Sequence, residues 1–287
     1  MLAYMEHLWL RYAAGTDIGR RRRVNEDSAF AGPALLAVAD GMGGHPHGDV
    51  ASAAAITAVA GPPAGRDPAA ALAAAVARAS ARLEELAAGD PELHGMGTTL
   101  TAMAWDGAGF AVAHIGDSRA YLLRGGDLFQ ITRDHTIVQT LVDGGRITPG
   151  EAADHPRASM LVRALQTGGD QRPDLFRQDA APGDRYLLCS DGVSGFVPAG
   201  AIRDALAGAA RPDDAVARLI ALADAAGGLD NITCVVADAV AGPPDPADPP
   251  GRVPLLVGAV ARPGGRGAAP GPAAGPTVPD PSPGSAR

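Results

Sequence analysis

Four aspartates, far apart in the chain, each lie where an apolar segment meets a glycine or a small polar residue. They are Asp40 in L-L-A-V-A-D-G-M-G-G, Asp117 in H-I-G-D-S-R-A-Y, Asp191 in R-Y-L-L-C-S-D-G and Asp230 in D-N-I-T-C-V-V. Hard divalent cations prefer carboxylate oxygens together with backbone carbonyls, and a glycine leaves its carbonyl accessible. An Asp-Gly pair is also a common turn, and Asp106-Gly107 is interpreted as a turn only. Because clustered carboxylates repel one another unless a cation lies among them, the recurrence favours a shared metal site.

A loop of basic and acidic residues, T-D-I-G-R-R-R-R-V-N-E-D-S, precedes Asp40. The arginines from Arg20 to Arg23 are interpreted mainly as a solvated basic patch. An arginine held beside carboxylates such as Glu26 and Asp27 can also receive a phosphate group, because its planar guanidinium matches phosphate geometry. The loop therefore supplies a candidate anion-binding residue close to the candidate metal ligands.

The elements that must position these residues are read from the apolar periodicity. Strands are expected at residues 8–15 and 35–39, helices at 48–60 and 69–88, and strands at 97–105, 110–115, 119–124 and 128–132. Further strands are expected near 159–164, at 174–179, ending at Asp191 and starting at Asp230, with helices at 198–207 and 213–226. This order fits neither a repeated βαβ unit nor a pure β sandwich. We therefore predict an α+β fold, a four-layer α-β-β-α sandwich of two central antiparallel sheets flanked by helices, with the acids at one sheet edge.

Residues 133–156 interrupt the series of strands. Their pattern predicts a helix that ends at Asp143, a glycine stop and a second short, capped turn. An insertion of this kind between sheet strands is expected to form a lid or flap that contacts the substrate.

The composition changes near residue 240. Residues 240–287 are rich in proline, glycine and alanine and have no periodicity, so this segment is expected to be disordered. The sequence thus predicts one domain at residues 8–239 followed by a disordered tail. The apolar patch at residues 255–261 is too short to span a membrane.

Composition and charge limit the class of protein. The 287 residues carry a net charge of -8, which argues against nucleic acid as a partner. Both cysteines, Cys189 and Cys234, lie in expected core strands and are interpreted as buried thiols of a cytosolic protein. No segment approaches the roughly 18 apolar residues of a membrane span, and the first residues do not look like a signal peptide. A cytoplasmic monomer is the expectation.

Seven short motifs in one order give the chain a family likeness. They are T-D-I-G-R-R-R-R-V-N-E-D-S, V-A-D-G-M-G-G-H, G-T-T-L, I-G-D-S-R-A-Y, T-R-D-H-T, C-S-D-G-V-S-G and D-N-I-T, spread over residues 8–238. In these motifs the chain resembles the metal-dependent PPM/PP2C protein serine/threonine phosphatases, in particular the bacterial type that opposes Hanks-type kinases.

The resemblance implies a role for each candidate site residue. Asp40 would bridge two Mn²⁺ or Mg²⁺ ions, Gly41 would give its carbonyl to one of them, and Asp191 and Asp230 would bind the other. Asp117, with Asp191, matches the site of a weaker third ion in bacterial members. Glu26 and Asp27 would hold metal-bound waters from the outer shell, and Arg22 occupies the position of the phosphate-binding arginine.

One position departs from the eukaryotic members of the family, where a histidine directly follows the Asp-Gly pair and is proposed as the general acid. Met42 stands there in this chain, as in bacterial relatives. His45, His47 and a metal-bound water remain alternative proton donors.

The expected activity is hydrolysis of phosphoserine and phosphothreonine in proteins by a water activated between two metal ions. The expected partners are phosphorylated proteins and a cognate serine/threonine kinase. Two alternatives stay open: a catalytically silent phospho-binding module on the same fold, and a two-metal hydrolase of small phosphoesters or nucleic acid. Measurable turnover with Mn²⁺ would exclude the first, and a comparison of phosphopeptide with oligonucleotide hydrolysis would test the second.

Overall fold

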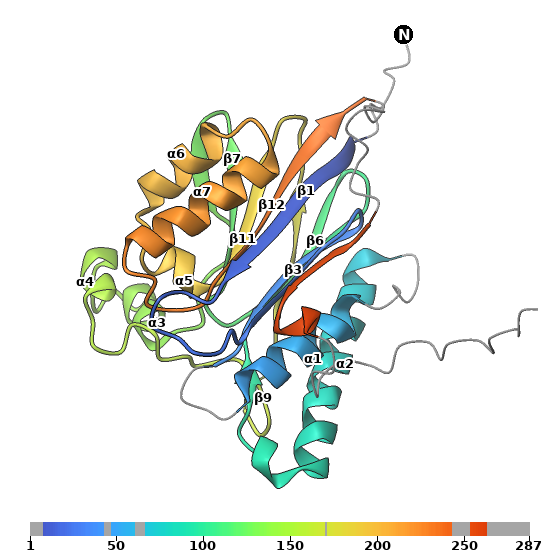
Figure 1. Ribbon diagram of the computed structural model, residues 1–287, viewed down its shortest axis with the longest axis vertical. Coiled ribbons are helices and arrows are strands. Elements are labelled where there is room, and N and C mark those ends of the chain that lie inside the picture. The colour runs from blue at the N-terminus through green and yellow to red at the C-terminus, as the bar shows by residue number, and fades with distance from the viewer. Residues whose placement is uncertain (1–7, 43–46, 61–66, 170, 243–252, 263–287) are drawn as a thin grey trace, which may run out of the picture.

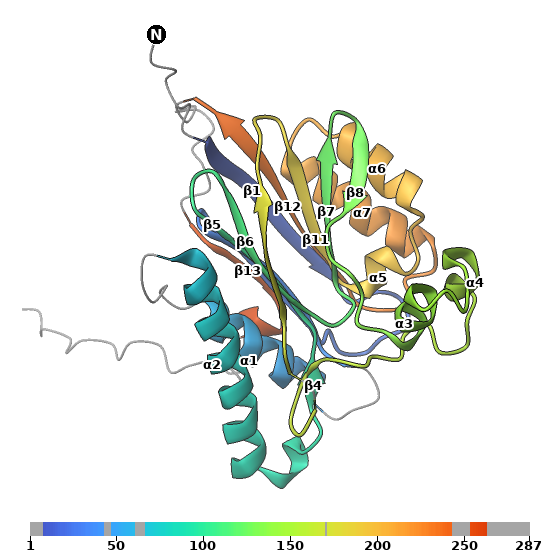
Figure 2. The ribbon, with the colours of Figure 1, turned by 180° about the vertical axis from the view of Figure 1, so that it is seen from behind.

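Two antiparallel β-sheets stack face to face, and helices cover the outer face of each (Figures 1 and 2). The structure is a computed structural model, and it describes residues 8–42, 47–60, 67–169, 171–242 and 253–262. The arrangement confirms the predicted α+β fold with its four layers. None of the described helices is long and apolar enough to cross a bilayer.

Each sheet is built entirely from antiparallel neighbours. The first sheet has the order β1 (Leu8–Asp17), β12 (Ile232–Ala241), β11 (Arg185–Cys189), β7 (Arg119–Arg124) and β8 (Asp127–Gln130). The second has the order β10 (Asp174–Asp179), β6 (Gly109–Ile115), β5 (Leu100–Trp105), β3 (Leu35–Asp40), β2 (Asp27–Ala31) and β13 (Leu255–Gly258). A separate short pair joins β4 (Gly97–Thr98) to β9 (Leu165–Gln166).

The helices form the two outer layers. The helices α1 (Gly48–Ala60) and α2 (Pro68–Gly89) cover the second sheet, and α5 (Asp191–Ser194), α6 (Ala199–Ala207) and α7 (Pro212–Ala225) cover the first. The helices α3 (Ile137–Asp143) and α4 (Pro149–Ala153) lie beyond the sheet edge, and two short 3₁₀ turns are η1 (Pro91–Leu93) and η2 (Ala259–Ala261). Asp67 starts α2 because its side chain accepts the Ala69 N–H, and Pro68 fits the first turn without needing a donor.

Three apolar layers hold the sandwich together. The central one lies between the sheets and includes Leu36, Phe110 and Tyr186, all fully buried. The second joins α1 and α2 to their sheet, and the third joins α6 and α7 to theirs. Burial of this apolar surface is the main stabilising contribution to such a fold, so the sheet rims are left for polar residues.

The antiparallel pairing brings the ends of distant strands to one rim. Cys189 pairs with Cys234, so the position two residues after β11 and the position two residues before β12 lie at the same rim, and these are Asp191 and Asp230. Asp40 at the end of β3 pairs with Asp27 at the start of β2. Ser190 Oγ then donates to Asp27 Oδ2 across 2.8 Å, which links the rims of the two sheets.

Several sequence-based expectations about elements need correction. β2 was not expected as a strand, because D-S-A-F-A is short and made mainly of small residues. Residues 159–164 form no strand; they contribute one bridge, between Leu161 and Thr136, just before β9. Asp191 does not end a strand but opens α5, one residue after Ser190 caps it.

The expectation of a wholly disordered tail is wrong for residues 255–261. Leu255 to Gly258 pair with β2 as an edge strand, and η2 follows directly. The composition of the whole segment hid four residues that can complete a sheet edge. Residues 243–252 and 263–287 lie outside the described part of the chain.

Candidate metal centre

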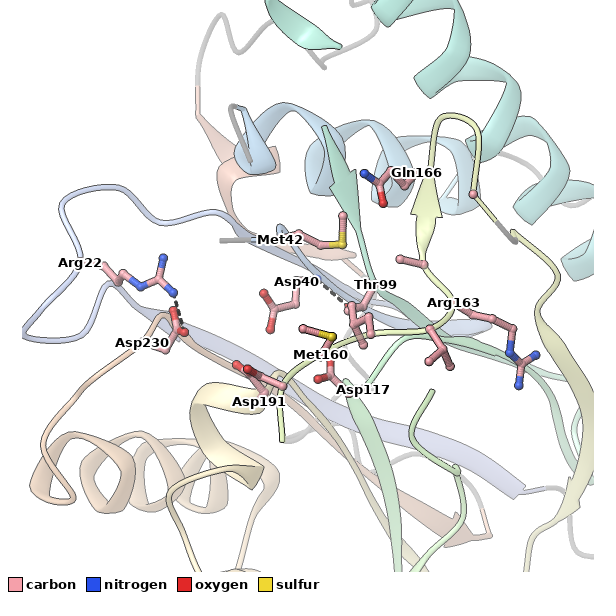
Figure 3. Close-up of a pocket in the computed structure, with 15 residues that line it drawn as sticks. Arg22, Asp40, Met42, Thr99, Asp117, Met160, Arg163, Gln166, Asp191 and Asp230 are labelled. Atoms are coloured by element: carbon pink, nitrogen blue, oxygen red, sulfur yellow. Dashed lines mark hydrogen bonds and ion pairs between the residues drawn. The ribbon is translucent and has the colours of Figure 1, made fainter. Parts of the chain in front are cut away.

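A pocket of about 470 Å³ opens at the rim where the strand ends meet. Figure 3 shows Asp40, Asp117, Asp191 and Asp230 around it, with Arg22 at one side. The remaining wall comes from Met42, Thr99 and the segment 159–166, including Met160, Arg163 and Gln166. The four aspartates that the sequence singled out therefore lie around one pocket.

Hydrogen bonds of Thr98 and Thr99 with the backbone N–H and carbonyl of Asp40 fix its position. Thr99 Oγ1 accepts the Asp40 N–H at 3.0 Å, and the Asp40 carbonyl accepts from Thr98 Oγ1 and from the Thr99 N–H, both at 2.9 Å. The G-T-T-L motif thus has a physical role, because its two hydroxyls hold the carboxylate-bearing residue in place (Figure 3).

Glycine is required after Asp40 by a close backbone approach. A Cβ at Gly41 would lie 2.4 Å from the Gly48 carbonyl oxygen, where α1 begins. The Gly41 N–H donates to the Glu26 carbonyl at 3.2 Å. Gly41 therefore lies directly against the start of α1 and against Glu26.

Asn231 ties the β12 end of the pocket to the arginine loop. Its side-chain N–H groups donate to the carbonyls of Ile18 and Val24, both at 3.0 Å, and its Oδ1 accepts the Glu26 N–H at 2.8 Å. This explains the asparagine of the D-N-I-T motif, since a change in its position would move Asp230 and the loop together.

Asp117 follows a turn that a histidine supports. Gly116 has φ +109°, and its N–H donates to His135 Nδ1 at 3.1 Å. Thr99 Oγ1 pairs with Ser118 Oγ at 2.6 Å on the other side of Asp117. The T-R-D-H-T motif therefore contributes to the site by holding the Asp117 turn.

The pocket acids are buried together, and their pKa values reflect it. Burial, then repulsion from Asp27, Asp191, Asp117 and Asp230, holds the pKa of Asp40 well above its usual range. Burial, then repulsion from Asp191, does the same to the pKa of Asp117. Burial raises the pKa of Asp191 to about 6; repulsion from Asp230 adds to the rise, and a hydrogen bond with Asp40 opposes it.

This donor set fits a hard divalent cation. Two carboxyl groups come within hydrogen-bonding distance only when one carries a proton or a cation lies between them, and Asp40 and Asp191 are such a pair. In the part of the chain that the structure describes, no three acid, imidazole or thiol groups are arranged so that they could hold a metal ion by themselves. The acids instead surround an open pocket, an arrangement that suits Mg²⁺-like ions, which keep several water ligands.

Arg22 is the member of the arginine run that lies at the pocket. Its Nη2 donates to Asp230 Oδ2 at 2.7 Å, and its Nη1 lies 3.8 Å from Glu26 Oε2 (Figure 3). Arg20 turns away to pair with Asp224 of α7 at 2.6 Å, while Arg21 and Arg23 are exposed. Asp230 therefore already shares one oxygen with Arg22, and its Oδ1 accepts the Asn231 N–H at 2.8 Å.

The two outer acids lie behind the pocket wall rather than on it. Asp27 is 1% exposed; burial raises its pKa to about 7 although hydroxyls of Thr233 and Ser190 oppose the shift, and its Oδ1 is a buried acceptor without a hydrogen-bond donor. Burial, opposed by the charge of Arg22, raises the pKa of Glu26. An unpaired buried carboxylate oxygen is costly, and a water on its pocket side would satisfy it.

Of the two candidate histidine proton donors, the structure describes His47 alone, and it does not line the pocket. His45 lies outside the described residues. His47 has φ +64° at the start of α1 and is not among the residues that line the pocket. Met42 does line it, with a side chain that carries no exchangeable proton.

The segment predicted to form a flap over the substrate, residues 133–156, ends a few residues before the segment that lines the pocket. The pocket is lined by residues from 159–166 rather than by the helices α3 and α4 at 137–153. Sequence analysis missed Met160, Arg163 and Gln166, because Met160 and Arg163 belong to no regular element and Gln166 ends the two-residue strand β9. The only hint was their place directly after the irregular insertion.

The cysteines do not line the pocket. Cys189 and Cys234 face each other in the β11–β12 register and are fully buried. Burial raises the pKa of Cys189 to about 12 and that of Cys234 still further. Neither can serve as a thiolate nucleophile near neutral pH.

Comparisons with known proteins were made for both sequence and structure. Residues 14–235 match the family described as Protein phosphatase 2C. The serine/threonine protein phosphatase PstP of Mycobacterium tuberculosis is 51% identical over 236 residues, which are 81% of this chain and 46% of PstP. The chain thus spans about half the length of that relative. The serine/threonine phosphatase stp of Listeria monocytogenes is 34% identical over 237 residues, which are 78% of this chain and 93% of stp.

The structural comparison points the same way. A crystal structure of M. tuberculosis PstP aligns with a TM-score of 0.77 at 51% identity, over 81% of this chain and all of the PstP chain. The catalytic domain of PstP in complex with two manganese ions aligns with a TM-score of 0.75 at 50% identity, over 81% of this chain and 99% of that chain.

Proposed function

Because this chain belongs to the protein phosphatase 2C family, we propose that it is a metal-dependent protein serine/threonine phosphatase. One observation carries the proposal: four aspartates from distant parts of the chain and an arginine meet around a single pocket. The manganese ions in the related PstP domain support the same reading of the donor set.

The acids of the pocket divide into inner and outer groups. We assign Asp40 as the ligand shared by two Mn²⁺ or Mg²⁺ ions, the Gly41 carbonyl as a ligand of one, and Asp191 and Asp230 as ligands of the other. Asp117, with Asp191, would hold a weaker third ion. Glu26 and Asp27 would accept hydrogen bonds from metal-bound waters, and the buried Asp27 Oδ1, which has no hydrogen-bond donor, supports this role.

The bound cations would screen the phosphate charge and lower the pKa of a shared water toward neutrality. The chain supplies positioning for this chemistry. Arg22 binds the non-transferred phosphate oxygens with guanidinium N–H groups, and Asp230 and Glu26 hold that guanidinium at the pocket edge. No histidine is among the described residues that line the pocket, so water is the proposed source of the proton that the leaving serine or threonine oxygen takes.

Phosphoproteins are the proposed substrates, with a cognate Hanks-type kinase as the opposing enzyme and the cytoplasm as the site of action. The names of PstP and stp support this substrate class. The pocket also suits a phosphorylated side chain on a larger chain, because among the described residues that line it Asp191 alone belongs to a helix.

The test is hydrolysis of a phosphothreonine peptide with Mn²⁺, with Mg²⁺ and with EDTA. The wild-type chain should turn over with either ion and lose activity in EDTA. Asp40→Asn should lower the rate of hydrolysis by a factor of about 10² or more, and its circular dichroism spectrum should be unchanged. Retained hydrolysis by this variant would refute the assignment.

The alternatives predict different results in the same assay. A silent phospho-binding module would bind the peptide but show no Mn²⁺-dependent release of phosphate. A hydrolase of nucleic acid would cleave an oligonucleotide faster than the peptide, which the net charge of -8 argues against.

A further inference from the structure

β13 and η2 form an ordered segment beyond the region shared with the family. The family match ends at residue 235, and residues 255–261, called here the docked segment, return to the second sheet. Leu255 pairs with Ala31 and Gly258 with Ser28, so β13 becomes the edge strand beside β2 (Figure 1). β2 begins at Asp27, one of the two outer acids.

Apolar side chains anchor the docked segment in two layers at once. Val257 packs against the core between the sheets, and Val260 packs against the core beneath α1. Ala259 is 5% exposed. Arg262, just beyond, adds an exposed ion pair with Asp49 of α1 at 3.8 Å, which contributes little to stability.

A chain of hydrogen bonds runs from the docked segment to the metal centre. The Val260 N–H donates to Ser28 Oγ at 3.1 Å, the Ser28 hydroxyl pairs with Ser52 Oγ at 3.0 Å, and Ser52 Oγ donates to the Glu26 carbonyl. Since an amide can only donate and Ser52 gives its proton to Glu26, the Ser28 proton must point to Ser52. The Glu26 carbonyl also accepts the Gly41 N–H, so the chain ends at the peptide that joins Asp40 to Gly41.

A close backbone contact reinforces this link. Gly258 has φ +85°, and a Cβ there would lie 2.1 Å from the Asp27 carbonyl oxygen. Only glycine permits both the left-handed conformation and this approach. The docked segment thus touches the peptides of both outer acids, at Asp27 directly and at Glu26 through two serines.

We propose that the docked segment is a positioning element of the metal centre, which holds the Glu26–Asp27 backbone and through it the Asp40–Gly41 peptide. This rests on the proposed function, because it takes the pocket acids as cation ligands. Groups that orient metal ligands from outside typically change metal affinity 10- to 100-fold. The docked segment acts one step further out, so its loss should weaken Mn²⁺ binding about tenfold.

The first test compares two glycines of the full-length chain that share a left-handed conformation. A Cβ at Gly258 (φ +85°) would lie 2.1 Å from the Asp27 carbonyl oxygen, whereas a Cβ at Gly242 (φ +89°) would have no atom within 4 Å. Isothermal titration with Mn²⁺ should give about tenfold weaker binding for Gly258→Val and wild-type binding for Gly242→Val. An unchanged Mn²⁺ affinity in Gly258→Val, even with a lower unfolding temperature, would mean a structural role only and overturn the proposal.

The second test covers the case in which Gly258→Val does not fold. Ser28→Ala removes the hydroxyl that receives the Val260 N–H in this series of hydrogen bonds, and it leaves the backbone pairing of β2 and β13 in place. The variant loses the hydrogen bonds of this hydroxyl to the Val260 N–H and to Ser52 Oγ, which should weaken Mn²⁺ binding about threefold, and hydrogen exchange of the Gly41 amide should become faster. Wild-type values for both would overturn the proposal.

The two proposals fail in distinguishable ways. If the wild-type chain binds Mn²⁺ and hydrolyses a phosphopeptide while the variants match it, only the positioning role is wrong. If the wild-type chain binds no Mn²⁺, both the proposed function and the positioning role are wrong.

Discussion

Arg22 is held at the pocket by two acids, Asp230 and Glu26, and this sets its electrostatic state. The charges of Asp230, Glu26 and Asp40 outweigh its burial and raise its pKa, so the guanidinium is fully charged. A guanidinium has five N–H donors in a fixed plane. It can therefore keep its bond to Asp230 while it donates to a phosphate from another edge.

The kinetic effect of removing Arg22 follows from this arrangement. Arg22→Ala should raise KM for a phosphopeptide about tenfold or more, because a charge-assisted hydrogen bond to phosphate contributes about 1.5–3 kcal/mol. The loss of kcat should be smaller, if the contact exists already in the bound ground state. Steady-state kinetics at saturating Mn²⁺ measure both constants.

Arg21→Ala is the matched control, since Arg21 is an exposed neighbour in the same run. It should leave both constants near wild type. Equal losses from Arg21→Ala and Arg22→Ala would instead assign the effect to the charge of the whole loop.

At the scale of elements, the start of α5 decides where Asp191 points. Asp191 is the first residue of this short helix, and Gly192 follows it against the chain that leads into β12. A Cβ at Gly192 would lie 1.9 Å from the Asn231 carbonyl oxygen. The glycine of the C-S-D-G motif is thus needed for packing, and the packing sets the separation of Asp191 from Asp230.

A pair of glycine substitutions tests this packing. Gly192→Ala should lower the free energy of unfolding by about 1–3 kcal/mol, because backbone atoms must move to accept the methyl group. Gly200→Ala in α6, where no atom lies within 4 Å, should be neutral or stabilise by up to about 1 kcal/mol. Urea unfolding of the metal-free variants measures both; a neutral Gly192→Ala would contradict the packing argument.

At the scale of the whole molecule, buried acids join the two sheets at one rim. Asp40 and Asp27 come from the second sheet, and Asp191 follows a strand of the first. Burial and mutual repulsion raise the pKa of all three, to about 7 for Asp27 and about 6 for Asp191. Folding without a cation therefore takes up protons at this rim.

The pH dependence of stability follows from these raised pKa values. Between about pH 4 and 7 these acids bind more protons in the folded chain than in the unfolded chain, so they lower the free energy of unfolding as pH rises through this window. His114 and His135, whose pKa values burial lowers, act in the opposite sense below about pH 6.5, but the raised acids outnumber them. In EDTA the unfolding temperature should be higher at pH 5 than at pH 8. Mn²⁺ competes with these protons, so it should raise the unfolding temperature at pH 8 and have little effect at pH 5.

Differential scanning fluorimetry at both pH values measures these shifts. Asp27→Asn is the informative variant, because it removes one raised carboxyl and should flatten the fall in EDTA. An unfolding temperature in EDTA that rises from pH 5 to pH 8 would contradict the raised pKa values of these buried acids.

The sequence by itself determined the four-layer architecture and the residues that meet at the rim. The helices at 48–60 and 69–88 and the strands at 119–124 and 174–179 appear in the structure within a residue of their predicted bounds. Their periodicity is strong and local, so it survives without knowledge of neighbours. The four aspartates were found because each lies at an apolar segment end, which is also a local signal.

The family resemblance named Arg22, but the residues by themselves left open which arginine of the run faces the pocket. The tertiary structure decided this, as it decided which segment completes the pocket wall and that residues 255–261 join the sheet. In each case the local sequence permits several outcomes. Asp230 pairs with Arg22 and Asp224 with Arg20, a choice made by strand and helix positions far along the chain. Likewise, the four-residue segment of β13 is too short to specify a strand by itself. It becomes a strand because β2 offers an edge for pairing and because the space beside Asp27 admits only a glycine.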